Sequence, residues 1–570
     1  MSTVAQIPQT PVISTPPCIE DFTGVPRVAY FSMEIAIREE MPTYAGGLGI
    51  LAGDLMRSAA DLGVAMVGVS LVSRRGYFRQ EITAEGDQVE KPDGWDPAQF
   101  GTRLTTSVCV RIAHRDVWVD GWLVRIDSPY GGAVPVILLD TNVERNAPSD
   151  RALTDVLYGG DAAYRLSQEI VLGIGGARML RALGFNIREY HMNEGHAALL
   201  ALELLREERA KNMTPQRALR SVRLRANFTT HTPIEAAHDR FPYVLVEQVL
   251  GDYTDVGLLR VLGGEQDLNM TRLALEMSGM VNGVSRLQAN GTLADQRIRS
   301  VSNGVHSRFW TCAPMAALFD RYVPEWMFEP ELLTRAVRIP TAELLAAHWQ
   351  AKGALLAEIR KRTAVALDLQ KPILTFARRM TSYKRPDLLF QDLEALRAIA
   401  RKQPFQIVVA GKAHPHDDRG KQMIRSIHDD ARALGQDVVT VFLPNHDLAL
   451  AKLLAAGSDV WLNTPLPPLE ASGTSGMKAA HNGVPSLSVL DGWWVDGCIE
   501  GVTGWGIDGE HHSHAEALYR KLRDVVLPLY AAGGESWAAV MRGSIVHNAS
   551  LFNSHRTLRR YAAEVYLGAA

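Results

Sequence analysis

The sequence is poor in cysteine and holds no long uncharged apolar run. Its four cysteines, Cys18, Cys109, Cys312 and Cys498, are far apart and show no CxxC spacing, which excludes a disulfide framework and a cysteine-based zinc site. We therefore expect a reducing, cytoplasmic setting. An uncharged apolar stretch of about 18 residues is absent, so we predict no membrane-spanning helix and no membrane partner.

An excess of one charge is also missing. The net charge is −3 for 570 residues, so the chain has no global basic field and nucleic acid is not favoured as a partner. Residues 1–26 hold five prolines and no Lys or Arg, which excludes a secretory signal and predicts a disordered tail. The sequence shows no GxSxG elbow, Walker loop or HExxH motif, and we predict no metal centre.

What is present is a composition typical of a globular protein, 46% hydrophobic, at a length too great for one core. An apolar strand pattern at 27–33 is followed by a glycine turn, a helical pattern to Leu62 and a second strand pattern at 64–72, which is the βαβ signature. Residues 105–139 alternate and predict an antiparallel meander. Helices dominate from 161 to about 300, with short strands at 188–192 and 225–231.

A second βαβ series begins near residue 371. Its predicted strands are 372–377, 405–411, 437–443, 458–463 and 484–490, and its predicted helices are 383–401, 417–434, 447–456 and 475–482. A long helix over 341–367 joins the two halves. We predict an α/β fold of two Rossmann-like doubly wound domains with a cleft between them. The expected segments are a tail at 1–26, domains at 27–340 and 341–540, and a C-terminal helix at 541–570 that packs back on the first domain.

In such folds ligands bind beyond the carboxyl ends of the strands, so the loops that follow strands are the informative ones. YAGGLG at 44–49 opens a helix, and the free N–H groups at Gly47 could bind an anion, although a simple tight turn explains the motif equally well. Residues 377–385, ARRMTSYKR, bring together Arg378, Arg379 and Lys384. They predict a phosphate clamp, the alternative being a solvated basic face.

Residues 470–478, EASGTSGMK, combine a small-residue loop with a lysine one helical turn later. Gly473, Thr474 and Ser475 could present N–H and hydroxyl groups to a phosphate. Lys478 could then form a Schiff base with an aldehyde on the same small molecule. On spacing alone, a capped helix with an exposed lysine explains the stretch better.

Three polar loops follow strand patterns: HMNEGH, TTHTPIEAAH and VSNGVH. Their Asn193, His231 and Asn303 could hydrogen-bond a polyhydroxylated ligand, although each residue taken singly is more often structural. Other suggestive stretches have simpler explanations. LGIGGARML at 172–180 lies inside a helical pattern, HPHDD at 414–418 fits a helix cap at Asp417, and HHSH at 511–514 fits a loop before a helix.

Together these stretches resemble the α-glucan phosphorylases (glycogen, starch and maltodextrin phosphorylases). The matching motifs, in family order, are YFSME (30–34), GGLG (46–49), NGV (282–284), SNGV (302–305), SYKR (382–385), GKA (411–413), EASGT with MK (470–478), NG (482–483) and LDG (490–492). EASGT with MK is the most specific of them. The chain resembles a short-form member, because only eleven residues separate YFSME from GGLG and leave no room for a long regulatory N-terminal region.

The resemblance implies a GT-B architecture and pyridoxal 5′-phosphate bound to Lys478. It implies that Gly473, Thr474, Ser475, Arg378 and Gly47 hold the cofactor phosphate, and that Arg379 and Lys384 bind substrate phosphate. The implied reaction is reversible phosphorolysis of a terminal α-1,4-linked glucose from maltodextrin or glycogen, which gives glucose 1-phosphate with retention. The glucosyl contacts that it implies are Glu470, Asn303, His231 and Leu48. A homodimer is a further family expectation.

Several positions depart from the family pattern. Ala45 replaces an asparagine, Arg378 a lysine, Ser382 an acidic residue and Ser475 a glycine, and His446-Asp447 stands where the family has Tyr-Arg. The last change places an acid where a cation contacts the cofactor phosphate. Two alternatives therefore stay open: a nucleotide-sugar glucosyltransferase on the same fold, and a glucan-binding or regulatory protein with a decayed site.

Overall fold

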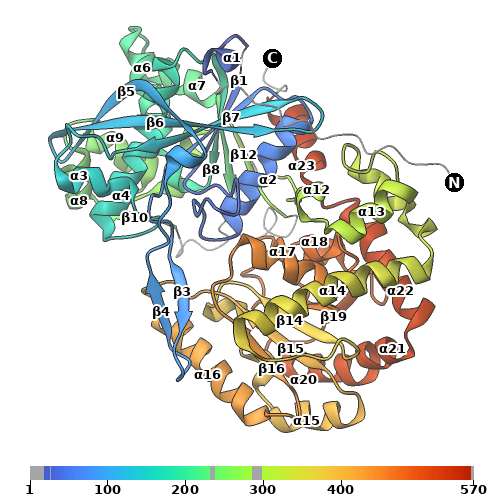
Figure 1. The fold of residues 1–570 in the computed structure, drawn as a ribbon. Coiled ribbons are helices and arrows are strands. Elements are labelled where there is room, and N and C mark those ends of the chain that lie inside the picture. The colour runs from blue at the N-terminus through green and yellow to red at the C-terminus, as the bar shows by residue number, and fades with distance from the viewer. Residues whose placement is uncertain (1–17, 26, 232–237, 286–297, 567–570) are drawn as a thin grey trace.

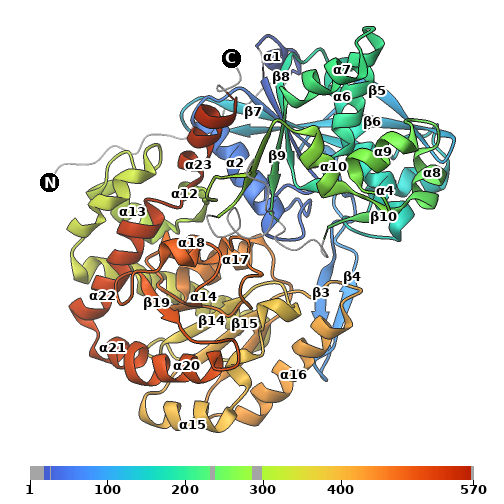
Figure 2. The same cartoon turned by 180° about the vertical axis from the view of Figure 1, so that it is seen from behind.

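The computed structural model describes residues 18–25, 27–231, 238–285 and 298–566. They form two domains, each built on a mainly parallel sheet with helices on its faces (Figures 1 and 2). Part of the predicted disordered tail is ordered: Glu20–Thr23 forms α1, because the aromatic ring of Phe22 is buried in the core. Residues 1–17 and 26 lie outside the described residues.

In the part of the chain that is described, the first domain has a nine-stranded sheet in the order β13-β12-β9-β8-β1-β2-β7-β6-β5. The strands from β13 to β7 are parallel, and β7, β6 and β5 form an antiparallel meander. The strands are β1 Arg27–Ser32, β2 Met66–Leu71, β5 Thr102–Ile112, β6 Arg115–Asp127, β7 Ala133–Asp140, β8 Ile187–Asn193, β9 Ala226–Thr230, β12 Met280–Gly283 and β13 Ile298–Ser300. The predicted strands at 188–192 and 225–231 are confirmed as β8 and β9.

Helices cover this sheet and fill the segment after the meander. They are α2 Gly47–Asp61, α3 Pro148–Arg151, α4 Ala162–Ile170, α5 Gly176–Ala182, α6 Leu199–Ala210, α7 Pro215–Arg223, α8 Tyr243–Leu250, α9 Val256–Gly263 and α10 Met270–Met277, with a small β10 Arg240–Pro242 and β11 Asp267–Asn269 pair. A π-helical turn at Val171–Gly175 links α4 to α5, so the glycine-rich stretch 172–180 is helical, as predicted. A Cβ at Gly176 would lie 2.6 Å from the Phe31 ring, so this glycine serves close packing on β1.

The second domain has a six-stranded parallel sheet in the order β16-β15-β14-β17-β18-β19. Its strands are β14 Ile373–Ala377, β15 Gln406–Ala410, β16 Thr440–Leu443, β17 Val460–Asn463, β18 Ser486–Val489 and β19 Gly504–Ile507. The five predicted strands are confirmed. β19 was not predicted, because Gly-Trp-Gly-Ile is short and two of its four residues are glycines.

The remaining helices in chain order are α12 Ser307–Trp310, α13 Ala313–Tyr322, α14 Thr341–Thr363, α15 Leu393–Lys402, α16 Asp418–Leu434, α17 Leu448–Gly457, α18 Ser475–Ala480, α19 Trp494–Gly497, α20 His514–Lys521, α21 Leu527–Ala532, α22 Gly534–Gly543 and α23 Ser554–Tyr561. The predicted helix at 383–401 is wrong at its start, since α15 begins only at Leu393. Pro386 disfavours a helical Arg385, which adopts a φ of 47°, and Asp392 caps α15 instead. Among the described helices, none is long and apolar enough to span a bilayer.

Two segments pack on a different domain from the one that their position in the sequence suggests. Buried residues from Met315 to Ile339 belong to the core of the second domain, and on this packing we propose a boundary between Trp310 and Met315 rather than at 340/341. Leu558 and Tyr561 on α23 pack in the core of the first domain beside α2. Two Rossmann-like domains joined in this way form the GT-B architecture, which confirms the predicted fold class.

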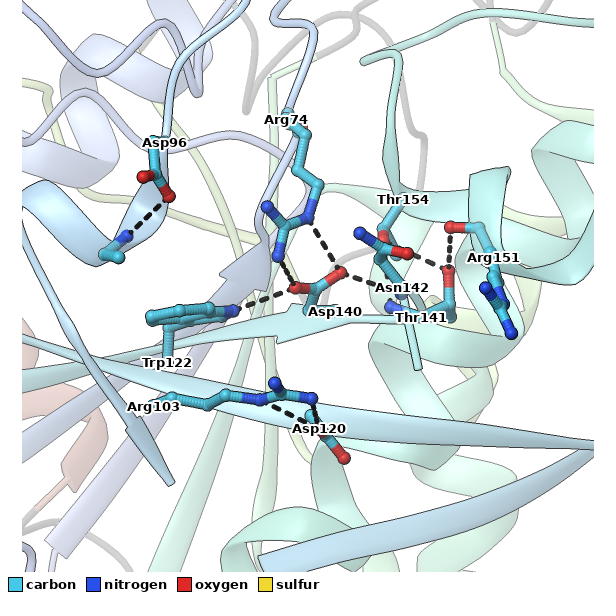
Figure 3. A network of polar contacts seen from close by, with 12 residues as sticks. Arg74, Asp96, Arg103, Asp120, Trp122, Asp140, Thr141, Asn142, Arg151 and Thr154 are labelled. Carbon is cyan, nitrogen blue, oxygen red and sulfur yellow. Dashed lines mark hydrogen bonds and ion pairs between the residues drawn. The ribbon is translucent and has the colours of Figure 1, made fainter. Parts of the chain in front are cut away.

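A two-stranded arm leaves the first domain between β2 and β5. It consists of the antiparallel strands β3 Arg79–Ile82 and β4 Gln88–Lys91, and it reaches α16 of the second domain (Figures 1 and 2). Its root is fixed by Asp140 at the end of β7. Asp140 pairs with Arg74 through both carboxylate oxygens, and the Trp122 indole donates to it at 2.8 Å (Figure 3). The arm was not predicted from the sequence.

Candidate active site

Lys478 lies on α18 at the contact between the two domains. Its side chain is 7% exposed, and its Nζ lies 4.1 Å from the centroid of the Trp310 ring. Burial lowers the Lys478 pKa to about 8, with Arg378 adding to the effect and Asp54 of α2 opposing it. An appreciable share of the amine is therefore unprotonated near neutral pH, as a carbonyl-binding lysine requires. The exposed lysine of the alternative interpretation is ruled out.

Glu470 holds two of the predicted cations. Its Oε2 lies 2.8 Å from Arg378 Nη2 and also accepts a hydrogen bond from Lys384 Nζ. Burial alone would raise the Glu470 pKa, but Arg378 and Lys384 outweigh it and lower the pKa to about 2. Gly473 has a φ of 74°, and a Cβ there would lie 3.2 Å from Arg378 Nη2, so the loop passes close over this pair.

Asp491 fixes the backbone of Glu470. Its Oδ2 accepts from the Glu470 N–H and its Oδ1 from the Gly492 N–H, both at 2.9 Å. Burial raises the Asp491 pKa to about 6. LDG is a family motif in the sequence, but no signal there links Asp491 to Glu470, because the contact joins two different loops.

The first domain contributes the carboxyl ends of three neighbouring strands, β1, β8 and β9. His231 Nε2 lies 2.7 Å from Asn193 Oδ1, and Asn193 Nδ2 donates to Ser32 Oγ at 3.1 Å. Burial lowers the His231 pKa to about 3, so the imidazole is neutral. Asn303 is buried, and among the described residues its Oδ1 has no partner. Of the loop 229–238, residues 232–237 lie outside the described residues.

Glu34 organises the glycine loop in front of α2. Its Oε2 accepts hydrogen bonds from the N–H groups of Ala45 and Gly46 at 2.6 and 3.0 Å. These bonds use backbone atoms, so they hold the loop although residue 45 is an alanine. Gly47, the first residue of α2, is exposed and Leu48 is half-buried. Arg379 is exposed. Burial of its guanidinium would lower its pKa, but Tyr383, followed by Tyr77 and Glu34 of the first domain, outweighs this effect and raises the pKa, so Arg379 lies near the first domain.

The predicted site residues thus fall into two groups. Those of the second domain form one cluster around Glu470 and Lys478, which contains Arg378, Lys384, Gly473, Thr474 and Ser475, while Arg379 is exposed beside it. Those of the first domain are Gly47, Leu48, His231 and Asn303. Within the cluster, the Ser475 hydroxyl already accepts a hydrogen bond from the Trp461 indole at 3.1 Å. Trp310 and Asp54 were not predicted, since nothing in their local sequence shows that they approach Lys478.

The carboxylate of Asp447 is bound outside this cluster. Its Oδ1 accepts from the Leu450 N–H at 2.8 Å as the cap of α17, and Arg362 Nη2 lies 3.9 Å from its Oδ2. His446 is half-buried, and burial together with the neighbouring charge of Lys478 lowers its pKa to about 3. The pair therefore presents a neutral imidazole, and no free acid, to the site.

Two histidine-rich features have structural explanations. Asp417 caps α16 by accepting from the Gly420 N–H at 2.9 Å, as predicted for HPHDD. Asp61, His306 and His555 form a buried cluster with spacing suited to a metal. His306 Nδ1 accepts from the Phe309 N–H at 3.1 Å, so its proton is on Nε2 and is donated to Asp61. Hydrogen bonds therefore account for the geometry of this cluster.

Comparison with known proteins agrees with the sequence motifs. The family model for carbohydrate phosphorylases matches residues 251–500. The maltodextrin phosphorylase of Thermococcus litoralis is 37% identical, over 95% of this chain and 70% of its own length. The glycogen phosphorylases of Mycobacterium tuberculosis and Aquifex aeolicus are 36% and 34% identical, over 95% of this chain and 71% and 86% of their own lengths. The chain belongs to the carbohydrate phosphorylase family, as a short-form α-glucan phosphorylase.

Proposed function

We propose that this protein catalyses the reversible phosphorolysis of an α-glucan, which releases the terminal glucose as glucose 1-phosphate. The observation that carries the proposal is the position of Lys478, a buried lysine with a pKa of about 8 beside a cluster of two buried cations and one carboxylate. A glycosyltransferase that uses a nucleotide sugar has no need of such a lysine.

The residues around Lys478 fit pyridoxal 5′-phosphate. Lys478 supplies the amine that would hold the aldehyde, and Arg378 supplies a buried cation for the phosphate. Ser472 Oγ is buried and, among the described residues, has no hydrogen-bond partner. This hydroxyl is therefore available to hydrogen-bond a ligand in the loop. The Gly473–Ser475 loop and Gly47 would complete the phosphate contacts. When bound, this cofactor supplies a phosphate that exchanges a proton with the substrate phosphate.

Substrate phosphate would bind between the domains. Lys384 and Arg379 would supply its cations from the second domain, and the N–H groups at the start of α2 would supply donors from the first. Arg378 and Lys384 share Glu470 in this structure. A phosphate can replace that carboxylate as the partner of Lys384, and Glu470 is then available to the glucosyl hydroxyls.

The glucosyl unit would lie against Glu470, His231, Asn303 and Leu48. The neutral imidazole of His231 has its ring nitrogen Nε2 engaged by Asn193, which fixes the ring and leaves its backbone carbonyl and Nδ1 for a sugar hydroxyl. Asn303 Oδ1 offers an acceptor. These groups orient the sugar, while the two domains exclude water, which would otherwise compete with phosphate for the glycosidic carbon.

Purified protein should release glucose 1-phosphate from phosphate and at least one of maltose, maltodextrin and glycogen. It should show a pyridoxal absorbance band that shifts on borohydride reduction. Lys478→Ala should lose both the band and the activity. Full phosphorolysis by Lys478→Ala without added cofactor would refute the assignment.

The same preparation separates the alternatives. Turnover of ADP-glucose or UDP-glucose without a pyridoxal band would indicate a glucosyltransferase. A pyridoxal band without glucose 1-phosphate release from any of the three glucans would indicate a binding or regulatory protein. Size-exclusion chromatography with light scattering tests the homodimer.

A further inference from the structure

The arm β3–β4 contacts the second domain mainly through two buried glutamines. Gln80 and Gln88 are 2% and 7% exposed and point to the same face of the hairpin, where their amides are joined by a 2.8 Å hydrogen bond. The strand periodicity of two places Arg79 and Glu81, beside Gln80, on the opposite, exposed face. Buried amides of this kind have to be fully hydrogen-bonded, and their partners show what the arm does.

Gln80 binds two separate loops of the second domain. Its Oε1 accepts from the Asn445 N–H at 2.9 Å, and its own N–H donates to Asn445 Oδ1 at 3.1 Å. Its Nε2 donates to the Gly411 carbonyl at 2.9 Å. One side chain therefore ties the loop after β15 to the loop after β16.

Gln88 completes the grip on the first of these loops. Its Oε1 accepts from the Ala413 N–H at 2.9 Å, and its Nε2 donates to the Ala413 carbonyl at 3.0 Å. Both backbone groups of Ala413 are thus bound by one amide. Lys412, between the two gripped residues, donates from Nζ to the Phe78 carbonyl at 2.7 Å, at the base of the arm.

These two loops border the active site. The Arg378 N–H donates to the Ala410 carbonyl at 3.0 Å, and a Cβ at Gly411 would lie 1.9 Å from the Arg378 carbonyl oxygen. The loop that the arm grips is therefore packed directly on the backbone of Arg378. The second loop continues into His446. Burial lowers the pKa of His446, and the charges of Lys478 and Lys412 lower it further.

The arm is also stiff at its root. Arg74, which precedes it, is bound to Asp140 of the first domain (Figure 3). The returning strand is held by the Trp95 indole, which donates to the Ser73 carbonyl at 2.9 Å. At its far end Lys421 and Arg425 of α16 pair with Glu90 and Asp87 at 2.9 and 3.0 Å. The arm therefore connects two fixed points, one in each domain.

We infer that Gln80 and Gln88 are positioning residues, which set the loop that packs on Arg378 and the loop that carries His446 relative to the first domain. Neither glutamine touches the reacting groups. They act through backbone atoms, so their loss displaces the phosphate-binding side of the site while the sugar contacts of the first domain stay in place. This inference rests on the proposed phosphorolysis for its kinetic readout only.

The test uses Gln80→Met and Gln88→Met, which keep the length of the side chain and remove its hydrogen bonds. Glu81→Gln, exposed on the same strand, is the matched control. Hydrogen exchange of the full-length protein should be about tenfold faster at Asn445 in Gln80→Met and at Ala413 in Gln88→Met, and unchanged in the control. This measurement needs no activity.

Kinetics give the second readout. We expect kcat/KM for phosphate to fall by roughly 10- to 100-fold in each variant, with a higher KM for phosphate and an unchanged KM for glucan. A merely structural role would lower the amount of active enzyme and leave both KM values alone. Folded variants with unchanged exchange, or with the phosphate KM of Glu81→Gln, would overturn the inference. An inactive wild type would instead overturn the proposed function.

Discussion

Removing the charge of Glu470 should make the unliganded protein less stable and more dependent on phosphate. Arg378 and Lys384 both contact Glu470 Oε2, so the two cations lie within about 5 Å of each other. At an effective dielectric constant of about 20, two unit charges at that distance repel by about 3 kcal/mol. The drop of the Glu470 pKa from 4.5 to about 2 corresponds to a similar value, about 3 kcal/mol.

Glu470→Gln should therefore unfold at a lower temperature by on the order of 6–12 °C, at the usual few degrees per kcal/mol for a domain of this size. Inorganic phosphate should recover most of that loss, because it replaces the missing negative charge, and it should stabilise the wild type less. Differential scanning calorimetry with and without phosphate measures both effects. Asp524→Asn, which breaks an exposed pair with Arg523, should show neither.

The pH dependence gives an independent check on the same residue. Because the folded pKa of Glu470 is depressed, its contribution is present above the unfolded pKa of 4.5 and is lost as the pH falls towards 2. Below that window the wild type and Glu470→Gln should converge in stability. Equal unfolding temperatures at neutral pH, or equal stabilisation of both proteins by phosphate, would refute the reasoning.

Three further predictions concern single side chains. Lys384→Ala should raise the apparent KM for phosphate and lower kcat, together by roughly 10- to 100-fold in kcat/KM, in a glucose 1-phosphate assay; an unchanged rate at all phosphate concentrations would contradict its role. Asp447→Ala should cost about 1 kcal/mol in thermal unfolding through loss of the α17 cap, Asp447→Ser should cost less, and the phosphate KM should stay the same in both. Borohydride trapping of pyridoxal phosphate on the cofactor-free protein should be half-maximal near pH 8, the pKa of Lys478, and should fall below it as the amine gains a proton; a midpoint near 10.4 would show an ordinary lysine.

The sequence predicted the parts of the fold that are encoded locally. Each strand of the second domain from β14 to β18 is an apolar run between turn signals, and such runs need no knowledge of their neighbours. The failures have equally local causes. β19 has two glycines in four residues, and the helix expected at 383–401 is interrupted by Pro386, whose effect on Arg385 outweighs the propensity of the later residues.

Only the part of the candidate site that the second domain contributes was predictable from the sequence. EASGTSGMK and the cationic loop at 377–385 lie at the carboxyl ends of strands in one sheet, so their approach follows from the fold class. Asp54 and Trp310 reach Lys478 from the first domain, and this contact depends on how the two domains dock. The arm is one of the contacts between the domains. Its alternating polar pattern at 79–91 resembles that of any exposed hairpin, and nothing in its sequence shows that Gln80 and Gln88 are buried.

The charge balance of the site bears on whether the acid at position 447 prevents anion binding. Arg378, Arg379 and Lys384 supply three positive charges, and Glu470 removes one. Asp447 would offset a second positive charge only if no nearby positive charge neutralised its own carboxylate. Its carboxylate caps α17, where the helix N-terminus is positive, and Arg362 lies 3.9 Å away. Both partners offset the charge of Asp447, so the anion site retains an excess of positive charge, which favours a working phosphorylase over a decayed one.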